Sequence, residues 1–296
     1  MERDLGLLRY RVRELLRLIR YRFFLWAGII PYLLGQVIAW HVHKTINWHY
    51  FCWGFLGIAL VLAAVELLNE YFDRKSGGER IFSEENPNIP GYFLPLALCF
   101  LLLAFFISLY FTFKIGRLIL LFSFLGFLAT YFYVGPPIKW AYRGLGELVI
   151  ALSYGPLMVL GSYYLQTERI DLLPIFVSLI LGLLIFVLAL ANELPDYYQD
   201  RLVGKRNIVV RLGRENAVRL FSLTLLSVFI LIGLGIILKI IPPLSLFTFF
   251  LLPLIYENIK TAQRYYDYPL EFISVIKNTL LLYLIFVLFL GISYLG

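Results

Sequence analysis

Apolar residues occur along this chain in runs of about twenty, separated by short polar segments. A helix needs roughly 20 apolar residues to cross the hydrocarbon core of a bilayer. Unpaired backbone groups are too costly in lipid, so each run is expected to be a helix. The candidate spans lie near residues 23–41, 50–70, 91–113, 117–134, 145–165, 172–192, 216–238, 243–259 and 276–295. The pattern therefore predicts an all-α, polytopic membrane protein with nine transmembrane helices, of which 243–259, interrupted by Pro253, is the least regular.

Composition agrees with this pattern. Of the 296 residues, 61% are hydrophobic and 15% are charged, and the mean hydropathy is +0.82. A chain this apolar needs the bilayer as its solvent. The net charge of +7 would suit nucleic acid only if it formed a basic face on a soluble fold, and here the bases are confined to segments between apolar runs. We therefore expect no nucleic-acid partner.

Basic residues also predict how the chain is oriented. Because successive loops alternate sides, most of the 26 Lys and Arg residues fall on one side. The positive-inside rule makes that side cytoplasmic. Residues 1–22 carry arginines spaced among Leu and Tyr, a pattern typical of an amphipathic helix lying on an anionic leaflet. We expect a multi-pass protein of the cell membrane with a cytoplasmic N-terminus.

Two copies of the pattern Asn-Glu-x-x-Asp close apolar runs on the predicted cytoplasmic side. The first runs from Asn69 to Asp73 and the second from Asn192 to Asp196, with Asp200 four positions further on. If the helix persists, Asn192, Asp196 and Asp200 share one face. Such carboxylate and amide oxygens are ligands that Mg²⁺ prefers, with water and substrate phosphate completing its octahedron. One motif alone could be a helix cap, but two on one side favour two halves of a metal site.

Basic residues accompany both motifs. Lys75 and Arg80 follow the first, and Lys205 and Arg206 follow the second. Metal ions together with fixed positive charge would suit a diphosphate, so these four residues are candidate diphosphate ligands. Further candidates are Arg22, nearest the membrane in the N-terminal arm, and Tyr133, Lys139 and Arg143 around the fourth loop. Each basic residue could instead serve to set the membrane orientation.

The segment from Tyr131 to Glu147 forms a further polar and aromatic cluster. Its Gly135-Pro136-Pro137 sequence is expected to end the fourth helix, because proline cannot donate a backbone hydrogen bond and restricts its predecessor. Tyrosine rings here could stabilise a cation. A carboxylate inside the membrane, such as Glu147, is costly unless paired or functional, and Arg143 is its possible structural partner. Tyr131 and Glu147 are candidates for contact with an acceptor or a cation.

These residues resemble the UbiA superfamily of intramembrane prenyltransferases. The segment Asn69–Glu79 is similar to that family's first aspartate-rich motif, and Asn192–Gly213 is similar to its second. The sequences Tyr142–Glu147 and Leu160–Gln166 resemble the branch that prenylates 1,4-dihydroxy-2-naphthoate in menaquinone synthesis. The motifs cover about residues 20–215, and the last third agrees only in helix number.

The resemblance implies a nine-helix bundle with a central cavity, formed by residues 23–296 as one domain and capped by cytoplasmic loops near 70–90 and 193–215. It implies two Mg²⁺ ions and catalytic carboxylates. The catalytic residues would be Asp73, Asp196 and Asp200, and the metal ligands would be these three with Asn69, Asn192 and Glu79. Many members carry an acid where this chain has Gly77, and the naphthoate branch often has it where Glu79 stands.

The implied reaction is prenyl transfer from an isoprenyl diphosphate to an aromatic acceptor, with 1,4-dihydroxy-2-naphthoate expected on resemblance alone. The acceptors 4-hydroxybenzoate, a glycerol-phosphate lipid, and a haem or chlorin stay open. Outside the enzymes, a secondary transporter is the alternative, since repeated motifs near broken helices also build ion sites. The expected partners are the two substrates and the lipid bilayer, and no obligate protein partner is evident.

Overall fold

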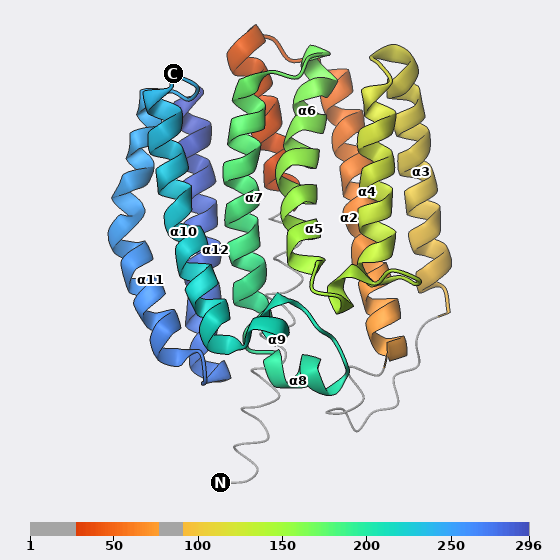
Figure 1. Ribbon diagram of the computed structural model, residues 1–296. Helices are drawn as coiled ribbons and strands as arrows, with labels where there is room; N and C mark the ends of the chain where they lie inside the picture. Colours follow the sequence, from red (N-terminus) through yellow and green to blue (C-terminus); the bar gives the residue numbers. More distant parts are fainter. Residues whose placement is uncertain (1–27, 77–90, 296) are drawn as a thin grey trace.

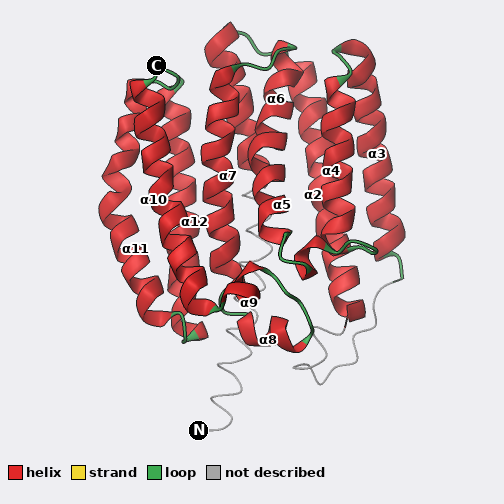
Figure 2. Cartoon of the chain, viewed as in Figure 1, coloured by secondary structure: helices red, strands yellow, loops and turns green. Residues whose placement is uncertain are grey.

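The computed structural model describes residues 28–76 and 91–295, except for the side chains of residues 73, 74 and 76. In this part of the chain the regular structure is entirely helical, with no strands (Figure 2). The expectation of an all-α protein is confirmed. The predicted N-terminal arm and most of the predicted cap loop at 70–90 lie outside the described residues.

Residues 28–43 are helical. The elements that follow are α2 (Trp48–Ser76), α3 (Phe93–Lys114), α4 (Leu118–Val134), the 3₁₀ turn η1 (Trp140–Tyr142), α5 (Gly146–Leu152), the π-helical turn η2 (Ser153–Leu157), α6 (Met158–Thr167), α7 (Leu172–Glu193), α8 (Tyr197–Leu202), α9 (Ile208–Leu212), α10 (Arg214–Ile237), the 3₁₀ helix η3 (Pro243–Leu251), α11 (Leu252–Tyr265) and α12 (Pro269–Ser293).

Within the described ranges, 6 helical stretches are long and apolar enough to cross a membrane. They are α2, α3, the continuous stretch Gly146–Thr167, α7, α10 and α12. Helix α4 is apolar but shorter, with 17 residues. These helices support a multi-pass membrane protein, and the count of nine spans stays a prediction.

The stretch predicted as one span at 243–259 has a different structure. It consists of η3 followed by α11, which continues to Tyr265. Pro253 lies in the first turn of α11. A proline there removes no intrahelical hydrogen bond, because the first backbone N–H groups of a helix have no partner within it. Pro253 therefore lies where the 3₁₀ helix η3 gives way to α11, which agrees with an irregular stretch at this proline.

Helix α7 lies in the middle of the bundle, where it packs against α5, η2, α10 and α12 (Figure 1). Its most apolar window is 61% buried inside the protein, compared with 17% for α3 at the edge. Gly155 of η2 lies against Gly182 of α7, and a Cβ on Gly155 would come within 2.6 Å of the Gly182 Cα. The absent side chains let the two backbones approach closely, as small residues do at helix contacts in membranes.

Both acidic motifs lie at one end of the bundle. Figure 1 shows the C-terminal ends of α2 and α7 there, together with α8 and α9, whereas the C-terminus of the chain lies at the opposite end. Asn69 is near the end of α2, and Asn192 is in the last turn of α7. We call this end, formed by the C-terminal parts of α2 and α7 with α8 and α9, the polar end.

Candidate functional site

The second acidic motif begins in the last turn of α7 and continues past a break. Helix α7 ends at Glu193, and α8 starts after Pro195. Leu194 still has helical backbone angles, but Pro195 cannot donate the next backbone hydrogen bond of the helix. The helix therefore does not persist through the motif, and Asn192, Asp196 and Asp200 do not share the face of a single helix.

Asp196 and Asn192 are placed differently from ordinary helix caps. Asp196 is the N-cap residue of α8, yet its side chain makes no capping hydrogen bond. Asn192 donates from Nδ2 to the Leu188 carbonyl oxygen at 2.8 Å, so its Oδ1 is the atom that it can offer to a ligand. These observations weaken the alternative that the motif is merely a pair of caps.

Four polar side chains, three of them buried and Glu193 partly buried, meet at this motif, and we call them the carboxylate cluster. They are Glu193, Asp200, Lys205 and Asn207. Lys205 Nζ lies 2.8 Å from Glu193 Oε2 and 3.1 Å from Asp200 Oδ2. Asn207 Nδ2 donates to the same two oxygens, at 2.7 Å in each case. One ammonium group and one amide thus bridge the two carboxylates.

The turn after α8 brings Lys205 back onto the carboxylates. Gly204 has φ +77°, in the left-handed region that glycine adopts without a steric penalty. The Lys205 backbone N–H then donates to the Asp200 carbonyl oxygen at 2.8 Å. This places Lys205 beside the carboxylate of Asp200 and so sets the geometry of the cluster.

The Asp200 carboxyl is in an unfavourable place for a lone negative charge. Burial raises the pKa of Asp200, the Lys205 ammonium lowers it, and the neighbouring Glu193 and Asp196 carboxylates raise it further, so that its pKa lies above the ordinary value. Desolvation and like charges both disfavour the ionised form. Additional positive charge beyond Lys205 would stabilise the cluster, which makes it a suitable neighbour for a divalent cation.

Glu147 closes the cluster from the side of α5. Its Oε1 accepts a hydrogen bond from the Ile208 backbone N–H, the first residue of α9, at 2.8 Å. Arg143, the structural partner considered for it, donates to the Pro137 carbonyl oxygen at 3.1 Å. Glu147 thus holds the start of α9 through Oε1, and its contact with an acceptor or a cation stays a prediction.

Two further contacts join the loop after α4 to the loop after α8. The Arg206 backbone N–H donates to the Tyr142 carbonyl oxygen at 3.1 Å. The Arg211 guanidinium donates to the carbonyl oxygens of Arg143, at 2.7 Å, and Arg206, at 2.9 Å. These bonds hold residues 139–147 and 203–213 together, so two segments distant in the sequence meet at the polar end.

The first motif is described in part. Among the described residues Asn69 Oδ1 is buried and has no hydrogen-bond partner. Lys75 lies over the ring of Tyr71, with Nζ 5.7 Å from the ring centre. Three of the predicted site residues, Arg22, Glu79 and Arg80, lie outside the described residues, as does the side chain of Asp73.

Mg²⁺ fits the residues that are described. Buried polar atoms are normally hydrogen-bonded, so the unpartnered Asn69 Oδ1 points to a ligand. Asn192 and Asp196 add hard oxygen donors, and Asp200 adds a carboxylate whose Oδ2 is anchored. No three His, Cys, Asp or Glu side chains converge within the described part of the chain. Mg²⁺ typically takes only one or two protein carboxylates and completes its shell with water and substrate phosphates.

The predicted aromatic residues lie between the polar end and the membrane interior. Tyr131 stacks on Phe127 and meets Phe72 of α2 edge-on, with ring centres 6.3 Å apart. Lys139 Nζ lies 5.3 Å from the centre of the Tyr142 ring. Tyr133 packs both against the buried cluster around α7 and against the smaller one between α2 and α4. Tyr131, Tyr142 and Lys139 therefore place aromatic faces and a base around the C-terminal end of α4.

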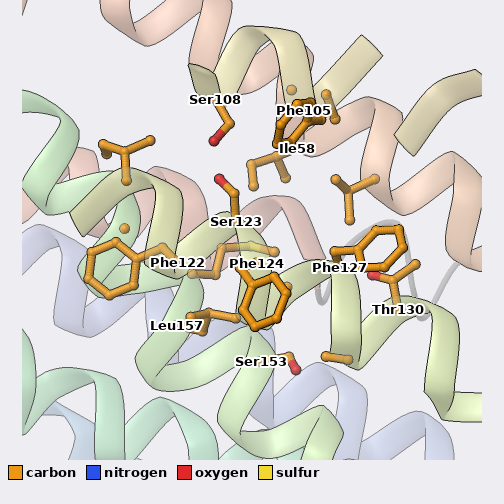
Figure 3. Close-up of a pocket in the computed structure, with 18 of the residues that line it drawn as sticks. Ile58, Phe105, Ser108, Phe122, Ser123, Phe124, Phe127, Thr130, Ser153 and Leu157 are labelled. Atoms are coloured by element: carbon orange, nitrogen blue, oxygen red, sulfur yellow. The ribbon is translucent and has the colours of Figure 1, made fainter. Parts of the chain in front are cut away.

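An apolar cavity of about 980 Å³ lies between α2, α3, α4 and the α5–α6 stretch. Figure 3 shows phenylalanines around it, including Phe105, Phe122 and Phe127, with scattered hydroxyls such as Ser123. Its lining reaches from Tyr133, next to the polar end, to Arg117, just before the first residue of α4. Because α4 has 17 residues, it is about 25 Å long. The cavity thus has room for a long hydrocarbon chain.

Asn207 is the site residue that the sequence interpretation missed. It is the N-cap of α9, and its Oδ1 accepts from the Val210 backbone N–H at 2.8 Å. An Asn directly before the apolar run Ile208-Val209-Val210 is a recognisable cap signal. The bridge from its amide to two carboxylates has no such signal, because those partners lie 7 and 14 positions away in the sequence.

The fold and the site together define a class of protein. A helical membrane bundle holds an apolar cavity, and at one end it gathers carboxylates, amides and bases. Such a protein handles a molecule with an apolar tail and an anionic head. The family model for UbiA prenyltransferases matches residues 28–276, so the chain belongs to the UbiA prenyltransferase family. The resemblance expected from the motifs is confirmed.

Curated relatives are naphthoate prenyltransferases. The chain is 26% identical over 253 residues to a 2-carboxy-1,4-naphthoquinone phytyltransferase of Synechocystis sp., covering 82% of this chain and 80% of that protein. It is 27% identical over 206 residues to a 1,4-dihydroxy-2-naphthoate octaprenyltransferase of Bacillus subtilis, covering 66% of this chain and 65% of that protein.

Solved structures share the fold. A digeranylgeranylglyceryl phosphate synthase superimposes with a TM-score of 0.68 at 19% identity, covering 94% of this chain and 96% of that one. A UbiA homologue from Archaeoglobus fulgidus bound to DMAPP and Mg²⁺ gives a TM-score of 0.58 at 14% identity, covering 96% and 98%. At such identities the likeness concerns the fold alone.

Proposed function

We propose that this protein transfers a prenyl group from an isoprenyl diphosphate to 1,4-dihydroxy-2-naphthoate in a Mg²⁺-dependent reaction within the membrane. The observation that carries the proposal is the position of Tyr133. It lines the apolar cavity, and a Cβ on Gly146 would lie only 3.3 Å from its ring, next to Glu147, whose carboxylate accepts from the start of α9 at the polar end. An isoprenyl diphosphate joins an apolar tail to an anionic head, and it would bind with its head at the polar end and its tail in the cavity.

The polar end would hold two Mg²⁺ ions. Their ligands would be Asn69 and Asp73 with Glu79 on one side, and Asn192, Asp196 and Asp200 on the other. When bound, such ions neutralise the charge that develops on the departing pyrophosphate. The predicted bases Arg22, Lys75, Arg80, Lys139, Arg143, Lys205 and Arg206 would contact the diphosphate oxygens.

Side chains of the protein would stabilise the cation formed from the donor and exclude water from it. Cleavage of the donor C–O bond releases pyrophosphate and leaves an allylic cation, which the faces of Tyr131 and Tyr133 would stabilise. The apolar lining of the cavity would keep water from this cation. The electron-rich ring carbon of the acceptor then forms a C–C bond to the cation and releases its proton, and a naphthoate acceptor finally exchanges its carboxylate for a proton with loss of CO₂.

Two features support a naphthoate acceptor over the other candidates. The first is the resemblance of Tyr142–Glu147 and Leu160–Gln166 to the naphthoate branch. The second is the activity of the two curated relatives. The likeness to a digeranylgeranylglyceryl phosphate synthase, at 19% identity, concerns the fold and does not favour a glycerol-phosphate lipid as acceptor.

We further propose a single nine-span domain in the cell membrane with the polar end in the cytoplasm. The excess of Lys and Arg on the polar-end loops supports this orientation. A transporter would hold its ion site near the bilayer midplane. The position of both acidic motifs at one end of the bundle argues against that alternative (Figure 1).

The central test is an acceptor panel. Membranes containing the protein are supplied with Mg²⁺, with geranyl or longer prenyl diphosphates, and with 1,4-dihydroxy-2-naphthoate or 4-hydroxybenzoate, and the products are identified by mass spectrometry. We expect a decarboxylated, prenylated naphthalene product that requires Mg²⁺. Full activity in excess EDTA would rule out the metal assignment, and product from 4-hydroxybenzoate alone would rule out the naphthoate acceptor.

The cavity predicts which donor chains are accepted. Gly126 lines it about 12 Å along α4 from Val134, and the nearest atom to a Cβ there would be in Leu157, 3.8 Å away. A Gly126→Leu side chain should enter the cavity, and overpacking against a long donor typically costs about 1–3 kcal/mol, which lowers kcat/KM by roughly 5- to 150-fold. Competition between geranyl diphosphate and a longer donor measures this effect, and the short donor should lose far less.

A matched substitution separates the cavity from general damage to the helix. Gly233 lies in α10 outside the cavity, and a Cβ there would meet nothing within 4 Å. Gly233→Leu should therefore keep the wild-type preference between donors. Equal losses for short and long donors in Gly126→Leu would show that the tail does not pass this point.

A further inference from the structure

The amide of Asn207 makes two separable sets of contacts. Its Oδ1 caps α9 by accepting from the Val210 backbone N–H at 2.8 Å. Its Nδ2 faces the other way and donates to Glu193 Oε2 and Asp200 Oδ2, both at 2.7 Å. The residue is 1% exposed, so water does not substitute for these partners. One side chain therefore ties a helix start to two carboxylates.

The two carboxylates depend on this bridge. Glu193 and Asp200 carry like charges, and Lys205 supplies a single cation between them. Breaking either contact would leave a buried carboxylate oxygen short of donors, which is costly. The Asn207 amide supplies one N–H to each oxygen without adding charge. It therefore holds the carboxylates close together without adding positive charge to the cluster.

The same contacts determine which carboxylate oxygen of Asp200 is bonded within the cluster and which can bind a ligand. The hydrogen bond from Asn207 and the ion pair with Lys205 both involve Oδ2. Oδ1 takes part in neither contact, so it is the oxygen that the carboxylate can present to a ligand. Partners of this kind, which orient a metal ligand without touching the metal, typically affect metal affinity by about 10- to 100-fold.

We infer that Asn207 is a positioning residue for the second acidic motif: its Nδ2 anchors Asp200 Oδ2 against Glu193 so that Oδ1 faces the divalent ion. This inference rests on the proposed function, because it takes Asp200 to be a metal ligand. It assigns Asn207 no contact with the substrates or the metal. The role is distinct from the capping of α9, which uses the other atom of the same amide.

The variants Asn207→Ser, Asn207→Asp and Asn207→Ala separate the two roles. Serine and aspartate keep an oxygen that can cap α9, since both are favoured N-cap residues. Neither supplies the bridging N–H groups, and aspartate adds a third negative charge. Alanine loses both functions. A matched control is Asn216→Ser in α10, because Asn216 is exposed and donates only to the Leu212 carbonyl oxygen.

The experiment measures Mn²⁺ binding to the detergent-solubilised protein by electron paramagnetic resonance, without any diphosphate, alongside thermal stability. We expect Asn207→Ser to weaken Mn²⁺ binding by about 10- to 100-fold, and to lower the melting midpoint less than Asn207→Ala does, because serine keeps the cap of α9. The Mn²⁺ affinity of Asn207→Asp should be lower than that of wild type by at least as much. Asn207→Ala should lose both Mn²⁺ affinity and thermal stability, and Asn216→Ser should match wild type in both.

The possible failures are distinguishable. Wild-type Mn²⁺ affinity in Asn207→Ser would overturn the positioning role and leave the proposed function intact. A loss of affinity that always follows a loss of thermal stability would assign Asn207 to folding alone and also overturn the inference. A wild-type protein that binds no Mn²⁺ but still transfers prenyl groups would overturn the metal assignment and this inference together.

Discussion

Asp196→Asn is expected to reduce prenyl transfer by roughly a thousandfold or more. A carboxylate ligand contributes to the several kcal/mol by which bound metal ions stabilise the developing charge, and about 4 kcal/mol corresponds to a thousandfold in rate. Asparagine has the same shape and is also a favoured N-cap residue, so α8 should still begin at this position. The rate is measured in membranes with saturating donor and acceptor over a series of Mg²⁺ concentrations.

Glu215→Gln is the control for loss of a carboxylate at the same end of the bundle. Glu215 is exposed and pairs with Arg219 one turn away in α10. Surface pairs of this kind contribute little to stability, so the variant should transfer prenyl groups at the wild-type rate. An Asp196→Asn protein with normal turnover would remove Asp196 from the site, whatever the behaviour of the control.

The helical architecture was largely readable from the sequence, because in lipid the length of an apolar run and the need for internal hydrogen bonds leave few alternatives. Proline acts locally at two places. The stretch 243–259, expected to be irregular at Pro253, changes there from η3 to α11. The spacing of Asn192, Asp196 and Asp200 would place them on one face only if the helix persisted, and α7 ends before Pro195.

The candidate site was readable as a set of motifs but not as a set of contacts. The lettering around Asn192 and Asp200 indicated oxygen ligands near a membrane boundary. The bond from Glu147 to the α9 backbone and the bridge from Asn207 to Glu193 join segments that are 61 and 14 residues apart. Such pairings depend on how the loops pack, and local patterns carry no information about them.

Lys205→Met is expected to destabilise the segment 193–213 strongly. Lys205 is the cation between Glu193 and Asp200, and its side chain is only 11% exposed. Removing one partner of a buried ion pair typically costs about 3–5 kcal/mol, because the remaining charges stay buried without compensation. Hydrogen exchange of this segment and the melting midpoint, both measured in Mg²⁺-free buffer, report the loss. Lys260→Met in α11, an exposed position, should leave both unchanged.

The loss of stability in Lys205→Met should become larger as the pH rises. Burial already raises the pKa of Asp200 in the folded protein, and Lys205 opposes that rise. Without Lys205 the folded-state pKa should lie higher still, whereas the unfolded value stays at about 3.9. An acid whose pKa is raised by folding favours the folded state fully below its unfolded pKa, and this contribution is lost as the pH rises through the folded pKa. The deficit of Lys205→Met should therefore be small near about pH 4 and grow towards alkaline pH. A deficit that is constant over this range would show that Lys205 stabilises the loop by packing and not by its charge.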